Sequence, residues 1–146
     1  MERARDLVAG GRRATANLRS VRAFDHAGTD INELARLLRV FYEQEKLEAQ
    51  VLDAPRGVLV QARAKGIRAL AGMSVSLTVC LREDDGKLLV EIGPGQWRGK
   101  AVAAAMSPWI PPLLLSAGYG ALRQRALPKK TYRFISSYLA GLVPTP

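Results

Sequence analysis

Residues 74–82, SVSLTVCLR, carry the clearest structural signal of the chain. Apolar valine and leucine alternate there with serine, threonine and cysteine. Because successive side chains of a β-strand point to opposite faces, this period of two predicts a strand with one buried and one wet face. One-sided burial is typical of an antiparallel sheet backed by helices, so the stretch favours the α+β class.

Three further strands are expected around this one, at residues 48–53, 58–64 and 87–92. The first two flank Ala54-Pro55-Arg56-Gly57, which has proline and glycine where a type I turn prefers them. Asp84-Asp85-Gly86 predicts a second hairpin turn, and Gly93-Pro94-Gly95 is expected to end the last strand. The pattern predicts an antiparallel sheet of about four strands.

Two amphipathic helices are expected to accompany the sheet. Asp30, with Glu33 three residues later, predicts a helix start, and apolar residues at helical spacing extend that helix over 31–46. A second helix is expected over 128–142, with Pro128 in its first turn. Lys129, Lys130 and Arg133 lie near its start, where cations oppose the helix dipole. An external anion would explain their placement, and solvation of exposed side chains is the simpler alternative.

The remaining segments set the domain organisation. Residues 1–28 are expected to form a basic arm, with a marginal helix at 14–24, and residues 29–146 a single α+β domain. Residues 65–73 combine Lys65 and Arg68 with apolar residues at helical spacing. They predict a short helix at the sheet edge or a surface patch.

An uncharged segment over 101–122, AVAAAMSPWIPPLLLSAGYGAL, is the most unusual part of the chain. A single helix over it would be about 33 Å long, enough to cross a bilayer. Three central prolines and cations on both flanks oppose one crossing. We therefore expect an apolar helical hairpin that bends at 108–112 and returns both flanks to the same side. The alternatives are a soluble hairpin packed on the sheet and a face buried against a partner protein.

Two sets of residues are the candidate contacts of this segment and its flanks. The side chains expected to enter lipid or an interface are Trp97, Met106, Trp109, Ile110, Leu113, Leu114, Leu115 and Tyr119. The cations expected to contact an anionic surface are Arg98, Lys100, Arg123, Arg125, Lys129, Lys130 and Arg133.

The charge of the chain points to an anionic partner. There are 22 lysines and arginines against 13 carboxylates, a formal charge of +9, and residues 92–146 contain no carboxylate. Phospholipid headgroups, nucleic acid and acidic proteins all fit such a surface.

Few residues of the chain could act in catalysis or bind a metal. Cys80 is the only cysteine and His26 the only histidine, so one chain cannot form an ordinary Cys/His zinc site. No nucleophile–base pair can be assembled, and residues 93–101 lack the glycine spacing of a phosphate-binding loop. Cys80 is expected to be inert. We therefore expect no enzyme activity, no cofactor and no metal, and the sequence identifies no small-molecule substrate.

Several short pieces suggest a relationship. They are Gly72-Met73-Ser74, Val90-Glu91-Ile92-Gly93 with Trp97 and Lys100, and Leu127-Pro128. Residues 42–139, which contain them, resemble a group of small uncharacterised bacterial α+β proteins with a Gly/Pro-rich apolar segment. The resemblance implies the architecture and no mechanism.

Together these patterns predict a non-enzymatic cytoplasmic protein at the inner face of a bacterial membrane. The apolar hairpin and its flanking cations would anchor it there. One alternative is a nucleic-acid-binding module that uses the basic arm and the C-terminal helix. Another is a soluble subunit that buries residues 101–122 against a partner protein.

Overall fold

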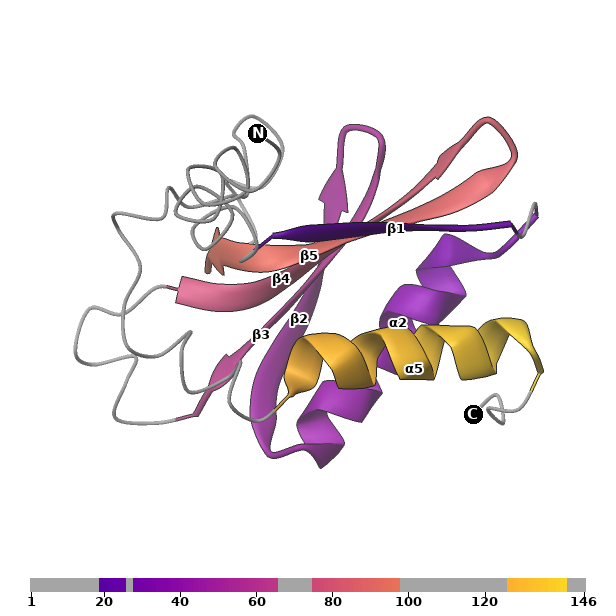
Figure 1. Cartoon of the computed structure of the whole chain (residues 1–146). Coiled ribbons are helices and arrows are strands. Elements are labelled where there is room, and N and C mark those ends of the chain that lie inside the picture. The colour runs from indigo at the N-terminus through magenta and orange to yellow at the C-terminus, as the bar shows by residue number, and fades with distance from the viewer. Residues whose placement is uncertain (1–18, 26–27, 66–74, 98–125, 142–146) are drawn as a thin grey trace, which may run out of the picture.

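A five-stranded antiparallel sheet with two helices on one face forms the described part of the computed structural model, which comprises residues 19–25, 28–65, 75–97 and 126–141 (Figure 1). The strands lie in the order β1-β5-β4-β3-β2. The elements in chain order are β1 (Ser20–Phe24), α2 (Ile31–Gln44), β2 (Leu47–Ala54), β3 (Gly57–Ala64), β4 (Val75–Asp84), β5 (Lys87–Gln96) and α5 (Leu127–Leu139).

The predicted α+β class is confirmed, and so are the four expected strands and both amphipathic helices. The Asp30 side chain accepts hydrogen bonds from the backbone N–H groups of Asn32 and Glu33, as an N-cap does. The β4–β5 turn has positive φ at both Asp85 (52°) and Gly86 (75°). That geometry matches the right-handed twist of the flanking strands, so this turn sets the register of the hairpin.

β1 corrects the expected number of strands and, over residues 20–24, the helix expected at 14–24; residues 14–18 lie outside the described residues. Residues 20–24 pair with β5, from Ser20 opposite Ile92 to Phe24 opposite Leu88. The spacing of Val21 and Phe24 suggested a helix, but pairing with β5 decides the conformation. Strand formation depends on such neighbours more than on intrinsic preference.

β5 also runs further than expected, because Gly93-Pro94-Gly95 continues the strand to Gln96. Pro94 lies opposite Leu77 of β4. β1 begins at the level of Ile92, so among the described residues β5 has a neighbour on only one side at Pro94. A proline, which lacks an N–H donor, is tolerated in a strand where one edge is free.

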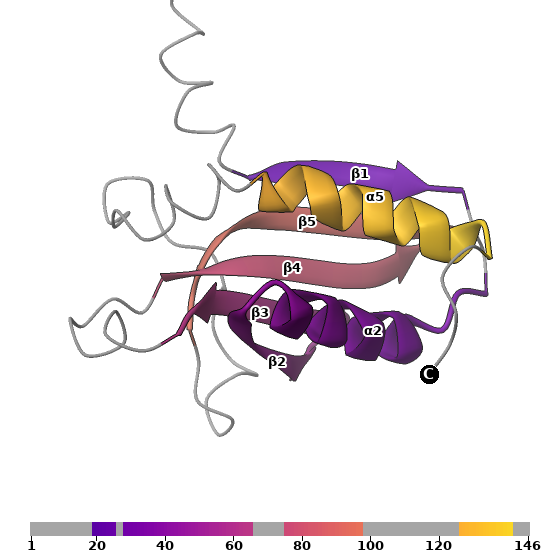
Figure 2. The same ribbon diagram turned by 90° about the horizontal axis from the view of Figure 1, so that it is seen from below.

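The main core lies between the sheet and the helices. Figure 2 shows α2 over the β2–β3 side of the sheet and α5 over the β1–β5 side. Leu34, Ala35 and Leu38 of α2 and Leu127 and Ile135 of α5 are fully buried against the sheet. The sheet contributes Leu47, Val58, Val60, Ala62, Leu77, Val79, Leu81, Leu88, Val90 and Ile92.

The strand directions divide the domain into two ends. At what we call the exit end, β1, β2, β4 and α5 begin and β3 and β5 end. At the opposite turn end lie the β2–β3 and β4–β5 turns, the start of α2 and the end of α5 (Figure 1). Residues 1–18 of the arm predicted over 1–28, residues 66–73 of the patch predicted over 65–73, and the whole hairpin predicted over 101–122 lie outside the described residues.

Candidate functional site

The exit end carries exposed cations from three separate parts of the chain. Lys46 lies between α2 and β2, Lys65 follows β3, and Lys129 is in the first turn of α5. None of these lysines forms an ion pair with another described residue. Their ammonium groups are therefore available to an external anion.

The carboxylates at the exit end are each held by a cation. The pairs are Lys130 with Glu45 (3.1 Å), Arg63 with Glu48 (3.0 Å) and Arg39 with Glu43 (3.4 Å). These partly exposed pairs add little stability, but they cancel the negative charge of this end. The three lysines consequently give it a positive excess.

The turn end has the opposite character. Its carboxylates form no ion pair with another described residue; they are Asp25, Asp30, Glu33, Asp53, Glu83, Asp84 and Asp85. Arg56 and Lys87 are the described cations of the two hairpin turns. The described domain is thus basic at one end of its strands and acidic at the other.

The cations predicted on the C-terminal helix have different roles. Lys130 is engaged by Glu45 and ties the start of α5 to the end of α2. Lys129 and Arg133 are exposed. The ion pair explains one of the three cations without an external ligand.

Trp97 is held at the point where β5 leaves the sheet. Its ring is half-buried, and the guanidinium carbon of Arg63 lies 4.0 Å from the ring centroid. Glu48 orients Arg63 from the neighbouring strand, with Nε 3.0 Å from Oε2. The three side chains fix an aromatic ring beside a cation, a cation–π arrangement.

The other predicted contacts lie outside the described residues. These are Arg98, Lys100, Arg123, Arg125, Met106, Trp109, Ile110, Leu113, Leu114, Leu115 and Tyr119. Lys46 is the last residue of the helix predicted over 31–46 and was not among the predicted contacts. Its proximity to Lys65 follows from the register of β2 with β3, and its proximity to Lys129 follows from the ion pair of Lys130 with Glu45. No local pattern reveals either.

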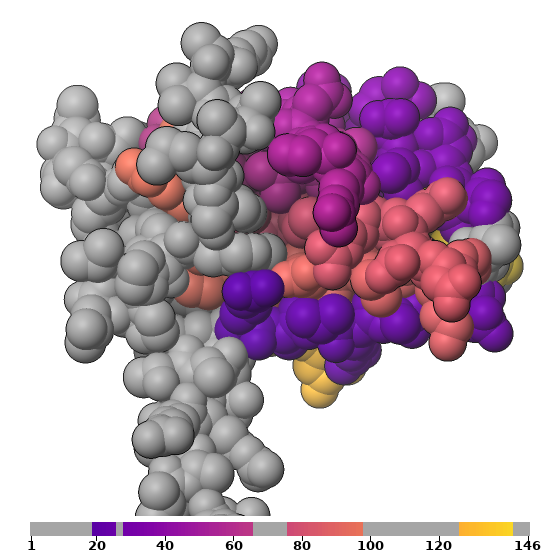
Figure 3. Space-filling model, turned by 90° about the horizontal axis from the view of Figure 1, so that it is seen from above, coloured from indigo at the N-terminus to yellow at the C-terminus, as the bar shows by residue number. Residues whose placement is uncertain are grey.

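Figure 3 shows the sheet face away from the helices. This face carries a second charged cluster, formed by Glu91, Arg19 and Arg82. Glu91 accepts from Arg19 at 2.9 Å and from Arg82 at 3.0 Å, and its side chain is only 7% exposed. The Nε atom of Arg82 is buried without a hydrogen-bond partner. Two arginines around one carboxylate stabilise the buried charge, but no further anion is indicated.

The same face is not wet along its whole length, which corrects the expectation for β4. Ser76 and Thr78 are fully buried, as is Gln61 on β3. Gln61 Nε2 donates to Thr78 Oγ1 (3.1 Å) and to the Gln96 carbonyl (2.7 Å), and Gln50 donates to Gln61 Oε1 (2.9 Å). Buried polar groups that are hydrogen-bonded in this way are tolerated.

Cys80 lies opposite Glu91 on this face. Burial raises the pKa of the thiol, and the negative charge of Glu91 raises it further, against the opposing effects of Arg82 and Arg19. Because the thiolate is the reactive form, the environment makes Cys80 a poor nucleophile.

We expect Cys80 to react several-fold more slowly with a disulfide reagent at pH 8 than an unstructured cysteine does. Glu91→Gln should accelerate the reaction, because loss of the carboxylate lowers the thiol pKa. Arg82→Gln should slow it. Acceleration in both variants would indicate a loosened sheet and would contradict this electrostatic account.

Within the described ranges no three His, Cys, Asp or Glu side chains approach closely enough to hold a metal ion. Neither α2 nor α5 is long and apolar enough to cross a bilayer. The exit end is therefore the candidate site that the described residues define best.

Comparison with protein-family models, with curated proteins and with solved structures found no match to this chain, so a function has to be argued from its own residues.

Proposed function

We propose that this protein is a membrane-tethered α+β domain, held by its apolar segment at 101–122. The single observation that carries the proposal is that the two described points flanking this uncharged, cation-bracketed segment, the end of β5 at Gln96 and the start of α5 at Leu127, lie at the same end of the domain. No catalytic or cofactor role is proposed.

The topology of the domain supports a hairpin that enters from one side. β5 ends at Gln96 and α5 begins at Leu127. The ion pair of Lys130 with Glu45 joins the start of α5 to the end of α2. The end of α2 leads directly into the start of β2, which pairs with the end of β3. Both connections to the segment thus arise at the exit end, as a segment that dips into one leaflet requires.

The side chains beside the apolar segment support the same proposal. Trp97 is fixed beside Arg63, and tryptophan is enriched at the depth of lipid headgroups. Arg98, Lys100, Arg123 and Arg125 bracket the segment in sequence. Each cation near an anionic leaflet adds about 1 kcal/mol of attraction, which supplements the apolar term.

A charge placed in the segment tests the proposal. We expect the unaltered protein to float with membranes in a density gradient and to resist carbonate extraction. Leu114→Asp should lower the membrane-bound to free ratio by about a hundredfold, since an aspartate inside hydrocarbon costs about 3 kcal/mol. Deletion of residues 101–122 should abolish the resistance to carbonate extraction.

Val40→Asp is the matched control, because it changes the charge equally at an apolar side chain that is 39% exposed on α2. It should leave flotation unchanged. Recovery of the unaltered protein in the soluble fraction would refute the tether, and so would equal effects of the two aspartates. Flotation also separates membrane binding from aggregation, because aggregates sediment.

A further inference from the structure

We infer that the folded domain itself binds anionic phospholipid headgroups through its exit end. The strands would then run roughly perpendicular to the bilayer, with the turn end farthest from it. This inference rests on the proposed tether and adds to it a lipid class and an orientation. Its basis is the juxtaposition of Lys46, Lys65 and Lys129, which does not include the apolar segment.

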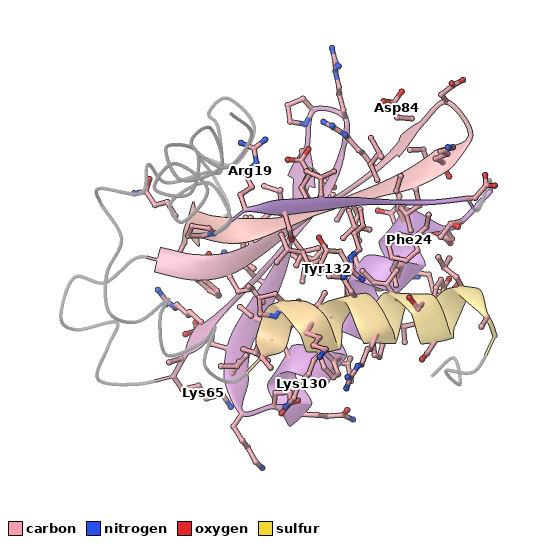
Figure 4. The ribbon with its side chains drawn as sticks, in the orientation of Figure 1. Arg19, Phe24, Lys65, Asp84, Lys130 and Tyr132 are labelled. Carbon is pink, nitrogen blue, oxygen red and sulfur yellow. The ribbon has the colours of Figure 1, made fainter. Side chains whose placement is uncertain are left out.

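The three lysines converge from distant parts of the chain. Lys46 precedes Leu47, and Leu47 lies opposite Ala64, the residue before Lys65. Lys129 adjoins Lys130, whose ammonium group contacts Glu45, the residue before Lys46. One ion pair and one strand register therefore bring them to the same end, as the labelled Lys65 and Lys130 illustrate in Figure 4.

The charges that could oppose binding are either cancelled or distant. Glu43, Glu45 and Glu48 at the exit end are in ion pairs. The unpaired carboxylates lie at the turn end, where Figure 4 shows Asp84 far from Lys65. β4 has 10 residues, so the two ends are separated by about 33 Å.

This separation exceeds the range of the membrane field. The potential of an anionic surface decays over about 8 Å at physiological ionic strength. With the exit end on the lipid, the lysines lie within that range and the turn-end carboxylates lie outside it. The reverse orientation would bring the carboxylates to the surface and repel it.

The experiment compares two triple variants of the full chain that lose the same charge. Lys46→Gln/Lys65→Gln/Lys129→Gln removes the exit-end cations. Arg36→Gln/Arg56→Gln/Lys87→Gln removes exposed cations elsewhere and is the control. Binding is measured by flotation with phosphatidylcholine vesicles, with and without added phosphatidylglycerol, over a range of salt concentrations.

We expect the exit-end triple to weaken binding to the anionic vesicles by about fivefold per lysine, and so by about a hundredfold in total. The control triple should change it by less than about threefold, because those cations lie outside the field. Binding to phosphatidylcholine alone should be the same for all three proteins. Equal losses for both triples, or no loss for either, would overturn the inference.

The outcomes also separate this inference from the tether. Salt-insensitive insertion into both kinds of vesicle, unaffected by the lysines, would keep the tether and reject headgroup binding. Binding to anionic vesicles that depends on the exit-end lysines but is fully reversed by salt or carbonate would keep headgroup binding and reject the tether. Displacement from anionic vesicles by RNA at an equal phosphate concentration would overturn the choice of lipid as the partner.

Discussion

Gly57→Ala is expected to lower the free energy of unfolding by about 3 kcal/mol or more. A Cβ atom at this position would fall inside van der Waals contact of the Leu81 carbonyl oxygen and 3.0 Å from Arg82 Cβ. The obstacle is backbone of the neighbouring strand, which cannot rotate away as a side chain could. Accommodation requires β3 and β4 to separate at the level of Gly57 and Arg82.

Denaturant unfolding of the purified protein measures this effect. Arg56→Ala, in the exposed turn immediately before Gly57, is the matched control and should change stability by no more than about 0.5 kcal/mol. Equal midpoints for the two variants would show that β3 approaches β4 less closely than described. A large loss of stability would confirm that the backbones of β3 and β4 lie too close at Gly57 to accept a Cβ atom.

Local patterns were sufficient to predict most of the fold. The alternation at 75–82 reports directly on β4, because one face of that strand packs on the helices. Asp30 caps α2, and Asp85-Gly86 makes the turn that its residue types favour. In each case the physical cause lies within a few residues of the pattern that reveals it.

Features that depend on distant partners could not be predicted in this way. β1 is a strand because β5 offers it an unpaired edge and because Phe24 of β1 packs against Tyr132 of α5. Thr78 is buried although its neighbours suggested a wet face. The exit-end lysines were invisible as a group for the same reason, because register and an ion pair between helices bring them together.

The candidate site was therefore predicted only in part. Lys129 and Trp97 were identified from their positions beside the apolar segment, and the structure places both at the exit end. Lys46 was missed, and Lys130 serves an internal ion pair. The hairpin itself and the insertion of its apolar side chains stay predictions.

Tyr132→Ala is expected to lower the free energy of unfolding by about 3–5 kcal/mol, the range typical of large aromatic truncations in a core. Tyr132 joins α5 to β1 through three kinds of contact. Its hydroxyl is 2.7 Å from Ser20 Oγ, the guanidinium carbon of Arg22 lies 4.1 Å from its ring centroid, and the Phe24 ring packs at 6.5 Å. Thermal and denaturant unfolding measure the loss.

Tyr138→Ala is the matched control, because Tyr138 lies on the same helix and is only partly buried. It should lower stability by about 1 kcal/mol. β1 is a short edge strand, so in Tyr132→Ala the amide protons of residues 20–24 should also exchange faster than those of β3 and β4. Equal effects of the two alanines would contradict the role assigned to Tyr132.

The pH dependence of stability gives an independent measure of the same contact. Burial raises the pKa of Tyr132 above its ordinary value of about 10, and its hydrogen bond to Ser20 and the Arg22 charge oppose the rise only in part. A raised pKa means that the neutral phenol stabilises the fold fully below the pKa of the unfolded chain, and that this contribution is lost as the pH rises through the folded value.

Tyr132→Phe should therefore be less stable than the unaltered protein by about 1 kcal/mol at pH 8, because the hydrogen bond to Ser20 is lost. The difference should shrink as the pH rises through the pKa of Tyr132. Cys80 and Tyr138 also have raised pKa values, but they are present in both proteins and cancel in the comparison. A difference that stays constant to the alkaline limit would contradict the raised pKa of Tyr132, and no difference at any pH would mean that packing of the ring alone holds α5 on β1.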